Sequence, residues 1–391
     1  LRVGQGGHVT PNLTPEDCKE FLKRGFSRRS FGRIATMLTA GATLPLYNEP
    51  AMAQLSVVKG PIPADAILLN ANENPMGPCA EAMEAMHNIV PKGGRYMYKL
   101  TDDMRDTLAA QEGLNPKYVR PFAGSSAPLQ QAVLAFCNRE RSYVAGDPGY
   151  EQGGKAAEFA KAKVFNVPLT KDYAHDVKAM AKADANAGLL YLCNPNNPTG
   201  TLTSREDMEW LLNNKPAGSI LMVDEAYIHF ASGASTMTDM VAKDKDIIVL
   251  RTFSKLYGMA GIRAGVAMAR PDLLEKFVPL TAGAMPVTSM VAANASLQVK
   301  DLVAKRRKTM QEVREDTLSW LDKHNFHYVP SVSNKFMVDV KRPGREVADA
   351  MFKEKIIIGR TWPCWPNYVR VTVGTRDEME KFKAAFLKVM A

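Results

Sequence analysis

Gly188-Leu-Leu-Tyr-Leu-Cys193 is an apolar run, and the polar loop Asn194-Pro-Asn-Asn-Pro-Thr-Gly200 follows it directly. Further apolar runs lie at 220–223, 247–250 and, less strongly, 265–269. Each run is short, apolar on both faces, and separated from the next by loop or helical sequence. Such runs are typical of strands in a parallel sheet that helices cover on both faces. The sequence therefore predicts an α/β fold with a mostly parallel sheet.

The chain of 391 residues is long enough for two domains of unequal size. The strand runs belong to a predicted large domain at 85–275, which an N-terminal arm at 54–84 precedes. A change of pattern near Leu274 indicates a smaller α+β domain at 276–391. The elements expected in that domain are long helices within 288–324, strands at 336–340, 356–358 and 368–373, and helices at 345–354 and 376–390.

Residues 1–53 are predicted to be a signal peptide that is removed on export. Arg28-Arg29 precedes an apolar stretch at 34–46, and Ala51-Met52-Ala53 follows as a small-residue cleavage pattern. The paired arginines resemble a twin-arginine signal, which implies the twin-arginine export machinery as a partner and a periplasmic location. The apolar stretch is too short to span a bilayer, so no stable membrane insertion is expected. A loose amphipathic helix that happens to contain two arginines is the alternative.

Composition and charge argue against several classes of function. The formal charge of +9 is spread along the chain, and no basic run carries interleaved aromatics, so no nucleic-acid partner is expected. The five cysteines form no CxxC pair and the six histidines form no HExxH motif, so no metal site is expected. The wide spacing of the cysteines favours buried apolar positions, with disulfides as the alternative.

Polar residues that follow three of the predicted strands form a chemical group. Asn197 lies after the first run, Asp224 after the second and Lys255 after the third. Because ligands bind at the carboxyl ends of parallel strands, these side chains are expected to meet at one edge. A lysine amine forms an imine with a carbonyl cofactor, and a buried carboxylate keeps a pyridine nitrogen protonated. The alternative for each residue taken singly is structural: a carboxylate after an apolar run is often only the end of a strand, and a lone lysine in a loop is usually solvated.

A phosphate-binding pattern accompanies this group. Ser254 and Arg263 flank a glycine-containing turn, and Gly124-Ser125-Ser126 precedes a helix expected to begin near Pro128. Backbone N–H groups at a helix N-terminus and a guanidinium group both bind phosphate oxygens. Gly-Ser-Ser before a helix is also a common N-cap, which is the structural alternative.

Together these motifs resemble the fold-type I aminotransferases that depend on pyridoxal 5′-phosphate (PLP). The resemblance rests on NPNNPTG at 194–200, DEAY at 224–227 and SK at 254–255, and it covers about 60–391. The segments at 69–75 and 369–375 are similar to the histidinol-phosphate aminotransferase-like branch of class I and II. The resemblance implies the type I PLP-dependent transferase fold, PLP as cofactor and a homodimer.

Roles for individual residues follow from the same resemblance. Lys255 would carry PLP as a Schiff base and move the substrate proton, Asp224 would pair with the pyridinium, and Tyr227 would contact the phenolate oxygen. The other implied contacts are Asn197 at the phenolate oxygen; Tyr150 stacked on the ring; Ser125, Ser126, Ser254 and Arg263 around the phosphate; Tyr96 lent by the second subunit; and Arg370 and Asn74 at the substrate, with Arg370 on its α-carboxylate.

The sequence departs from that family at two places. Ala127 stands where relatives usually have an acidic residue, and Gly359-Arg360-Thr-Trp-Pro-Cys-Trp365 replaces a strand that usually ends in Val-Arg. The second departure predicts a side-chain pocket that does not suit histidinol phosphate. The predicted reaction moves an amino group from an L-amino acid to a 2-oxo acid. The same cofactor also supports the alternatives of O₂-dependent oxidation, racemisation, elimination by a lyase, and decarboxylation.

Overall fold

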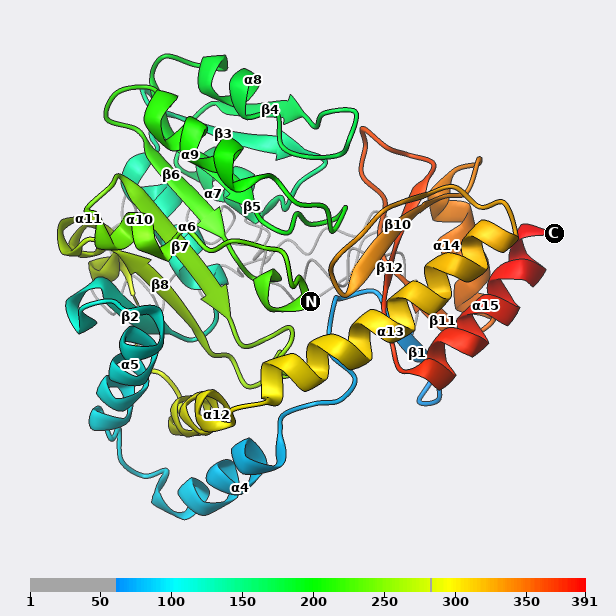
Figure 1. The fold of residues 1–391 in the computed structure, drawn as a ribbon, viewed down its shortest axis with the longest axis horizontal. Coiled ribbons are helices and arrows are strands. Elements are labelled where there is room, and N and C mark those ends of the chain that lie inside the picture. Colours follow the sequence, from blue (N-terminus) through cyan, green and yellow to red (C-terminus); the bar gives the residue numbers. More distant parts are fainter. Residues whose placement is uncertain (1–60, 282) are drawn as a thin grey trace, which may run out of the picture. The chain divides into compact units, whose positions relative to one another are not determined.

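Figure 1 shows the structure, a computed structural model that describes residues 61–281 and 283–391. Its largest sheet has seven strands in the order β2-β8-β7-β6-β5-β3-β4. Their bounds are Val119–Phe122 (β2), Ser142–Asp147 (β3), Val164–Pro168 (β4), Ala187–Cys193 (β5), Ile220–Asp224 (β6), Ile247–Thr252 (β7) and Gly265–Ala269 (β8). The four apolar runs of the sequence are therefore strands, and they lie next to one another as β5 to β8.

One strand of this sheet runs against the others. Strands β3 to β7 pair in parallel, whereas β8 is antiparallel to both of its neighbours, β2 and β7. The prediction of a mostly parallel sheet is confirmed, but the parallel orientation expected for 265–269 is wrong. Parallel neighbours need a crossover connection, usually a helix. Residues 253–264, which join β7 to β8, contain no helix, and the chain returns antiparallel.

Both faces of the large sheet are buried because its strands are apolar on both sides. In β5, Leu189 and Tyr191 belong to one core cluster while Leu190 and Leu192 belong to the other. The helices α6 (Ser126–Phe136), α7 (Gln152–Phe159) and α11 (Pro271–Phe277) contribute to the first cluster. The second receives side chains from α5 (Lys99–Glu112), α8 (Val177–Lys182), α9 (Arg205–Asn214) and α10 (Thr238–Ala242). This two-sided cover leaves the ends of the strands as the part of the sheet where polar side chains can gather.

The C-terminal part of the chain builds a second sheet. Strands β9 (Tyr328–Val329), β10 (Lys335–Asp339) and β12 (Tyr368–Thr372) form it in the order β12-β10-β9, all antiparallel. The helices here are α13 (Leu302–Lys323), α14 (Gly344–Lys353) and α15 (Arg376–Met390). Helix α15 begins at a capping box, in which Thr375 and Glu378 bond each other's backbone N–H groups. Every element predicted in this region is present within about two residues.

An N-terminal segment joins the two parts of the fold. Strand β1 (Ile67–Leu69) pairs in parallel with β11 (Ile356–Ile358), so residues far apart in the sequence lie side by side. Helix α4 (Ala80–Ile89) packs on α12 (Val287–Gln298), which also contacts α5. By contacts the described residues belong to one unit, and the boundaries at 84/85 and 275/276 stay predictions. The predicted signal peptide, 1–53, lies outside the described residues.

The cysteines, the helices and the possible metal ligands of the described residues can be compared with the expectations from the sequence. Its four cysteines are unbonded; Cys79, Cys137 and Cys193 are buried as expected, whereas Cys364 is exposed. Residues 61–281 and 283–391 include no helix that is long and apolar enough to cross a membrane. The same residues contain no group of three or more His, Cys, Asp or Glu side chains suited to a metal ion.

Candidate active site

Strands β5, β6 and β7 bring the predicted group together at their carboxyl ends. The Asn194 N–H donates to the Asp224 carbonyl at 2.9 Å, and the Glu225 N–H donates to the Leu250 carbonyl at 2.8 Å. These bonds continue the strand pairing one residue past the sheet, so the three ends stay in register. Asp224, the last residue of β6, and Lys255, which follows β7, are only 4% and 5% exposed. A carboxylate and an amine are thus buried at one edge, as the sequence predicted.

The Asp224 carboxylate is held in place by two donors. The Tyr191 hydroxyl, from the neighbouring strand, donates to Oδ2 at 2.9 Å, and the Ala226 N–H donates to Oδ1 at 3.1 Å. Burial and the nearby Asp224 charge raise the pKa of Tyr191 well above its usual value, so this phenol keeps its proton and remains a donor. Two hydrogen bonds favour the ionised carboxylate, which is the form that retains a proton on a pyridine nitrogen.

A buried ion pair connects the ends of β6 and β7. The Arg251 guanidinium, at the end of β7, donates to Glu225 Oε2 at 2.9 Å and also to Glu112 of α5. Both Glu225 and Arg251 are buried. Because Glu225 adjoins Asp224 and Arg251 lies four residues before Lys255, this pair links the two segments that carry the reactive groups. Removing one partner would leave an uncompensated buried charge.

The Lys255 amine and the Arg370 guanidinium both reach the segment that follows β1. Lys255 Nζ donates to the Ala71 carbonyl at 3.1 Å, and Arg370 Nη2 donates to the carbonyl of Asn70. Arg370 Nη1 donates to Asn197 Oδ1 at 3.0 Å, which ties β12 to the NPNNPTG loop. The pairing of β1 with β11 is what delivers this segment to the edge of the large sheet.

Arg370 is almost fully buried, at 5% exposed, and its Nε has no acceptor among the described residues. Burial, reinforced by the charge of nearby Arg360, lowers the pKa of Arg370 to about 10. The guanidinium nevertheless stays charged at neutral pH. A buried cation with an unused donor is suited to an incoming carboxylate, which would supply both the acceptor and the opposite charge.

Asn72 is a site residue that the sequence analysis did not select. Its Nδ2 donates to the Tyr227 hydroxyl at 2.9 Å and lies 3.4 Å from Asn197 Oδ1. Asn74, for which a contact with substrate stays a prediction, donates to the Leu256 carbonyl through Nδ2 and accepts from the Met76 N–H through Oδ1. Both asparagines belong to the motif at 69–75, and only the course of the backbone distinguishes them. Tyr191 was missed as well, since it reads as an ordinary apolar position within a strand run.

A cradle of backbone and side-chain donors lies at the start of α6. Gly124 has φ +89°, and a Cβ there would stand 2.3 Å from Arg263 Nη2; a Cβ on Gly265 would stand 2.6 Å from the Ser125 nitrogen. Only glycine permits such close approach. Ser125 occupies the N-cap position of α6 without a capping bond from its side chain. Arg263 Nη1 donates to Ser254 Oγ at 3.3 Å, so the predicted phosphate ligands converge, with Ser126 opening the helix.

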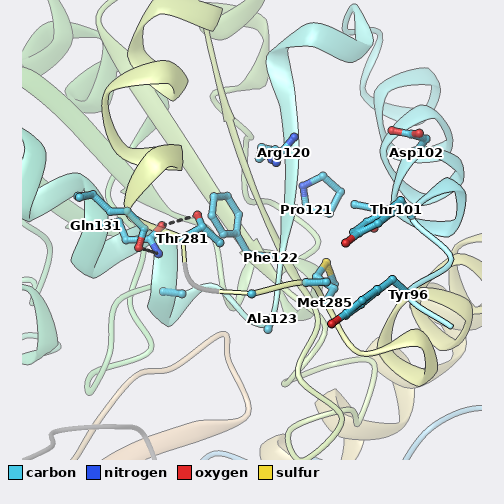
Figure 2. Close-up of a pocket in the computed structure, with 15 residues that line it drawn as sticks. Tyr96, Thr101, Asp102, Arg120, Pro121, Phe122, Ala123, Gln131, Thr281 and Met285 are labelled. Atoms are coloured by element: carbon cyan, nitrogen blue, oxygen red, sulfur yellow. Dashed lines mark hydrogen bonds between the residues drawn. The ribbon is translucent and has the colours of Figure 1, made fainter. Parts of the chain in front are cut away.

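The two tyrosines that were predicted to contact the cofactor, Tyr150 and Tyr96, differ in how much of each side chain is exposed. Tyr150 is half-buried against the core and donates its hydroxyl to Gln152 Oε1 at 2.7 Å. Tyr96 is 69% exposed and stacks on Tyr98, with 5.5 Å between ring centroids. Tyr96 lines a cavity of about 660 Å³. Pro121, Phe122 and Met285 line the same cavity (Figure 2). Exposed stacked aromatics are a common feature of subunit interfaces.

The segment 359–365, which departs from the family pattern, contacts the loop that follows β3. Trp362 is buried and donates its Nε1 to the Gly149 carbonyl at 2.9 Å. The guanidinium carbons of Arg360 and Arg370 lie 4.9 Å and 5.5 Å from the centre of its ring. Arg360 also pairs with Glu151 at 2.7 Å. Region 359–365 therefore places an indole and a paired guanidinium beside Arg370.

Residues 64–386 match the family described as aminotransferase class I and II. The chain belongs to this family. This aminotransferase is 32% identical over 331 residues to a histidinol-phosphate aminotransferase of Halalkalibacterium halodurans, a match that covers 83% of this chain and 89% of that protein. It is 30% identical over 343 residues to the histidinol-phosphate aminotransferase of Moorella thermoacetica, covering 84% and 86%. The chain is thus a PLP-dependent aminotransferase of the histidinol-phosphate aminotransferase-like kind.

Solved structures agree on the fold. The PLP complex of a histidinol-phosphate aminotransferase from Sinorhizobium meliloti superposes with a TM-score of 0.79 at 24% identity, covering 89% of this chain and 95% of that one. An aspartate aminotransferase variant from Thermus thermophilus gives 0.74 at 18%, covering 83% and 92%. The L-threonine-O-3-phosphate decarboxylase of Porphyromonas gingivalis also shares the fold, with 0.72 at 20%, covering 82% and 98%. The fold alone therefore does not specify the reaction.

The residues at this edge fit PLP, which carries an aldehyde, a pyridine ring and a phosphate. Lys255 supplies a buried amine for the aldehyde, and Asp224 supplies a hydrogen-bonded carboxylate for the ring nitrogen. The glycine-lined cradle around Ser125, Ser254 and Arg263 offers N–H, hydroxyl and guanidinium donors for the phosphate. Each part of the cofactor therefore meets a group of complementary chemistry.

Proposed function

We propose that this aminotransferase moves the amino group of an L-α-amino acid to a 2-oxo acid. One observation carries the proposal: Lys255 and Arg370 donate to consecutive carbonyls, those of Ala71 and Asn70. A cation that binds a carboxylate and an amine that acts at the adjacent carbon must lie within the length of one amino acid. Lys255 and Arg370 meet that requirement, because the two carbonyls to which they donate belong to adjacent residues of one segment.

PLP supplies an aldehyde and a ring that accepts electron density from the substrate's Cα. In the proposed mechanism Lys255 Nζ would hold the cofactor covalently and, once the amine of the substrate had taken its place, would be free to move the proton of the substrate's Cα. Asp224, oriented by Tyr191 and the Ala226 N–H, keeps a proton on the ring nitrogen. Tyr227 and Asn197 would contact the phenolate oxygen, and Asn72, which donates to the Tyr227 hydroxyl oxygen, would orient that hydroxyl.

The remaining residues would bind rather than react. Ser125, Ser126, Ser254 and Arg263 would hold the phosphate, and Tyr150 would cover the ring. We propose a homodimer in which Tyr96 serves the second subunit's phosphate group. The high exposure of Tyr96, its stacking on Tyr98 and the adjacent cavity support that proposal.

The substrate side chain is proposed to differ from histidinol phosphate, which the similar enzymes are named for. Arg360, the cation nearest to Arg370 in this region, is already paired with Glu151 and covered by Trp362. A phosphate would have to displace a carboxylate at 2.7 Å. An uncharged side chain packed on the indole requires no such exchange.

A spectrum of the purified protein, followed by a panel of L-amino acids with and without a 2-oxo acid, tests the proposed reaction. Transamination predicts that the amino acid alone converts the cofactor once, and that the 2-oxo acid restores it. Oxo-acid formation that continues without an acceptor while O₂ is consumed would instead indicate an oxidase. Loss of CO₂, or change of configuration at Cα without any oxo acid, would indicate a decarboxylase or a racemase.

Arg370→Ala is expected to lower kcat/KM for α-amino acids by roughly 30-fold or more, because a buried charge-assisted pair is worth about 2 kcal/mol at least. Amines without a carboxylate should be much less affected, since they offer nothing for the guanidinium to bind. Steady-state rates with both substrate types, together with cofactor content and the melting temperature, measure this. Arg139→Ala, at an exposed arginine, is the matched control. An equal loss for amines and amino acids would make Arg370 a structural residue.

We also propose that residues 1–53 direct export by the twin-arginine route and that the mature enzyme is periplasmic. The order of paired arginines, apolar stretch and Ala51-Met52-Ala53 supports this. Changing Arg28 and Arg29 together to lysine should retain at least about tenfold more of the protein in the cytoplasm, because the charge is kept while the motif is lost. Immunoblots of cell fractions measure the distribution, and unchanged export of the double variant would rule out this route.

A further inference from the structure

A second lysine is buried beside the site and takes no part in the mechanism above. Lys335 opens β10 and is 0% exposed. Its Nζ donates to Ser333 Oγ at 2.9 Å and lies 3.1 Å from the centre of the Tyr227 ring. Within the described part of the chain Lys335 has no ion-pair partner, and the Tyr227 ring face and Ser333 Oγ are the groups that its amine contacts in place of water. A cation over an aromatic face is attracted by the ring's quadrupole.

The charged and titratable groups that surround Lys335 come from several elements. Besides Tyr227 they are Cys193 at the end of β5, Asp224 at the end of β6, Lys255 after β7 and Arg370 on β12. Burial lowers the pKa of Lys335 and raises that of Tyr227, while Lys255 and Arg370 oppose the rise at Tyr227. Burial also keeps the Cys193 thiol neutral by raising its pKa. Asp224 is then the one anion against three basic groups in this set.

Tyr227 is held from two sides. Asn72 donates to its hydroxyl oxygen, so the phenolic proton remains for a different acceptor. Lys335 Nζ lies against the ring face, and in its protonated form, which the ring and Ser333 Oγ stabilise against the cost of burial, it makes the phenol a stronger hydrogen-bond donor. Under the proposed function the acceptor of that proton is the cofactor's phenolate oxygen. A stronger donor there draws negative charge away from Lys255 Nζ, which then releases its proton more readily.

We propose that Lys335 is a positioning residue that acts through Tyr227 to favour the unprotonated state of Lys255 Nζ. The inference rests on the proposed function, because it needs Tyr227 to contact the cofactor. A neutral apolar side chain in place of Lys335 would keep the packing but remove the charge. Lys255 Nζ would then hold its proton to higher pH.

The test is a pH titration of the bound cofactor's absorbance, which reports the protonation of Lys255 Nζ without any turnover. It compares wild type, Lys335→Met, Tyr227→Phe and the double variant, with Lys353→Met as control at an exposed lysine. In Lys335→Met the midpoint should rise by about one pH unit. In the Tyr227→Phe background the same change should move the midpoint by less than about 0.3 units, because the mediating hydroxyl is absent.

An unchanged midpoint in Lys335→Met would overturn the proposal, and so would an equal shift in both backgrounds, which would mean that the charge acts without Tyr227. If Lys335→Met does not fold, Ser333→Ala replaces it. That variant removes the oxygen that stabilises the charged amine, so the midpoint should rise by a smaller amount, and an unchanged midpoint would again overturn the proposal. Failure of the proposed function looks different: wild type itself would show no cofactor absorbance that depends on Lys255.

Discussion

Lys255→Ala is expected to abolish the covalent bond between protein and PLP and to lower kcat on the order of 10⁴-fold. The loss is large because one amine both holds the cofactor and moves the substrate proton, and each role contributes separately. No neighbour replaces it directly, since Lys335 Nζ lies against the Tyr227 ring. Borohydride reduction followed by mass spectrometry measures the covalent bond, and single-turnover kinetics measure the rate.

Lys245→Ala is the matched control, because Lys245 is an exposed lysine that precedes β7. It should keep both the reducible bond and the wild-type rate. The melting temperature of Lys255→Ala, compared with that of wild type, shows whether the fold survives the loss of the amine that donates to the Ala71 carbonyl. A variant that still gives a reducible adduct at wild-type yield would show that a different lysine carries the cofactor.

Asp224→Asn is expected to retain PLP but to lower kcat by roughly 100-fold, or about 3 kcal/mol of barrier. An amide is similar in size, yet it lacks the charge that keeps the ring nitrogen protonated. The single amide oxygen can still accept from one of the two donors, the Ala226 N–H or the Tyr191 hydroxyl, and the Tyr191 hydroxyl can instead accept from the amide N–H, so the fold should persist. Cofactor content, the absorbance spectrum and kcat separate binding from catalysis.

Asp172→Asn serves as the control for this change, at an exposed aspartate in the connection before α8. Activity of Asp224→Asn within about threefold of wild type, under about 1 kcal/mol, would mean that Asp224 is not the partner of the ring nitrogen. Loss of PLP together with loss of folded protein would point to a structural role for the buried carboxylate.

The strands and the family could be read from the sequence because their signals are local. Runs such as 220–223 and 247–250 are apolar on both faces, and such a pattern has few stable solutions outside a covered sheet. The convergence of Asp224 and Lys255 followed as well, since parallel strands place their carboxyl ends on one edge. Arg370 could be proposed only through a family motif, because nothing in its own strand indicates which way the side chain points.

Tertiary structure alone decided the features that depend on distant segments. The pairing of β1 with β11 brings Asn72 to Tyr227 and leaves Asn74 with backbone partners, although both asparagines look alike in the sequence. Strand β8 runs antiparallel because the connection that precedes it contains no helix. The apolar pattern of a strand does not indicate the direction in which the strand runs. Lys335 is the clearest case: a lysine at a strand start predicts exposure, yet the sheet turns it onto the ring of Tyr227. The surroundings of a side chain are determined by residues that lie far away in the sequence. The sequence alone does not show which of these distant residues come into contact.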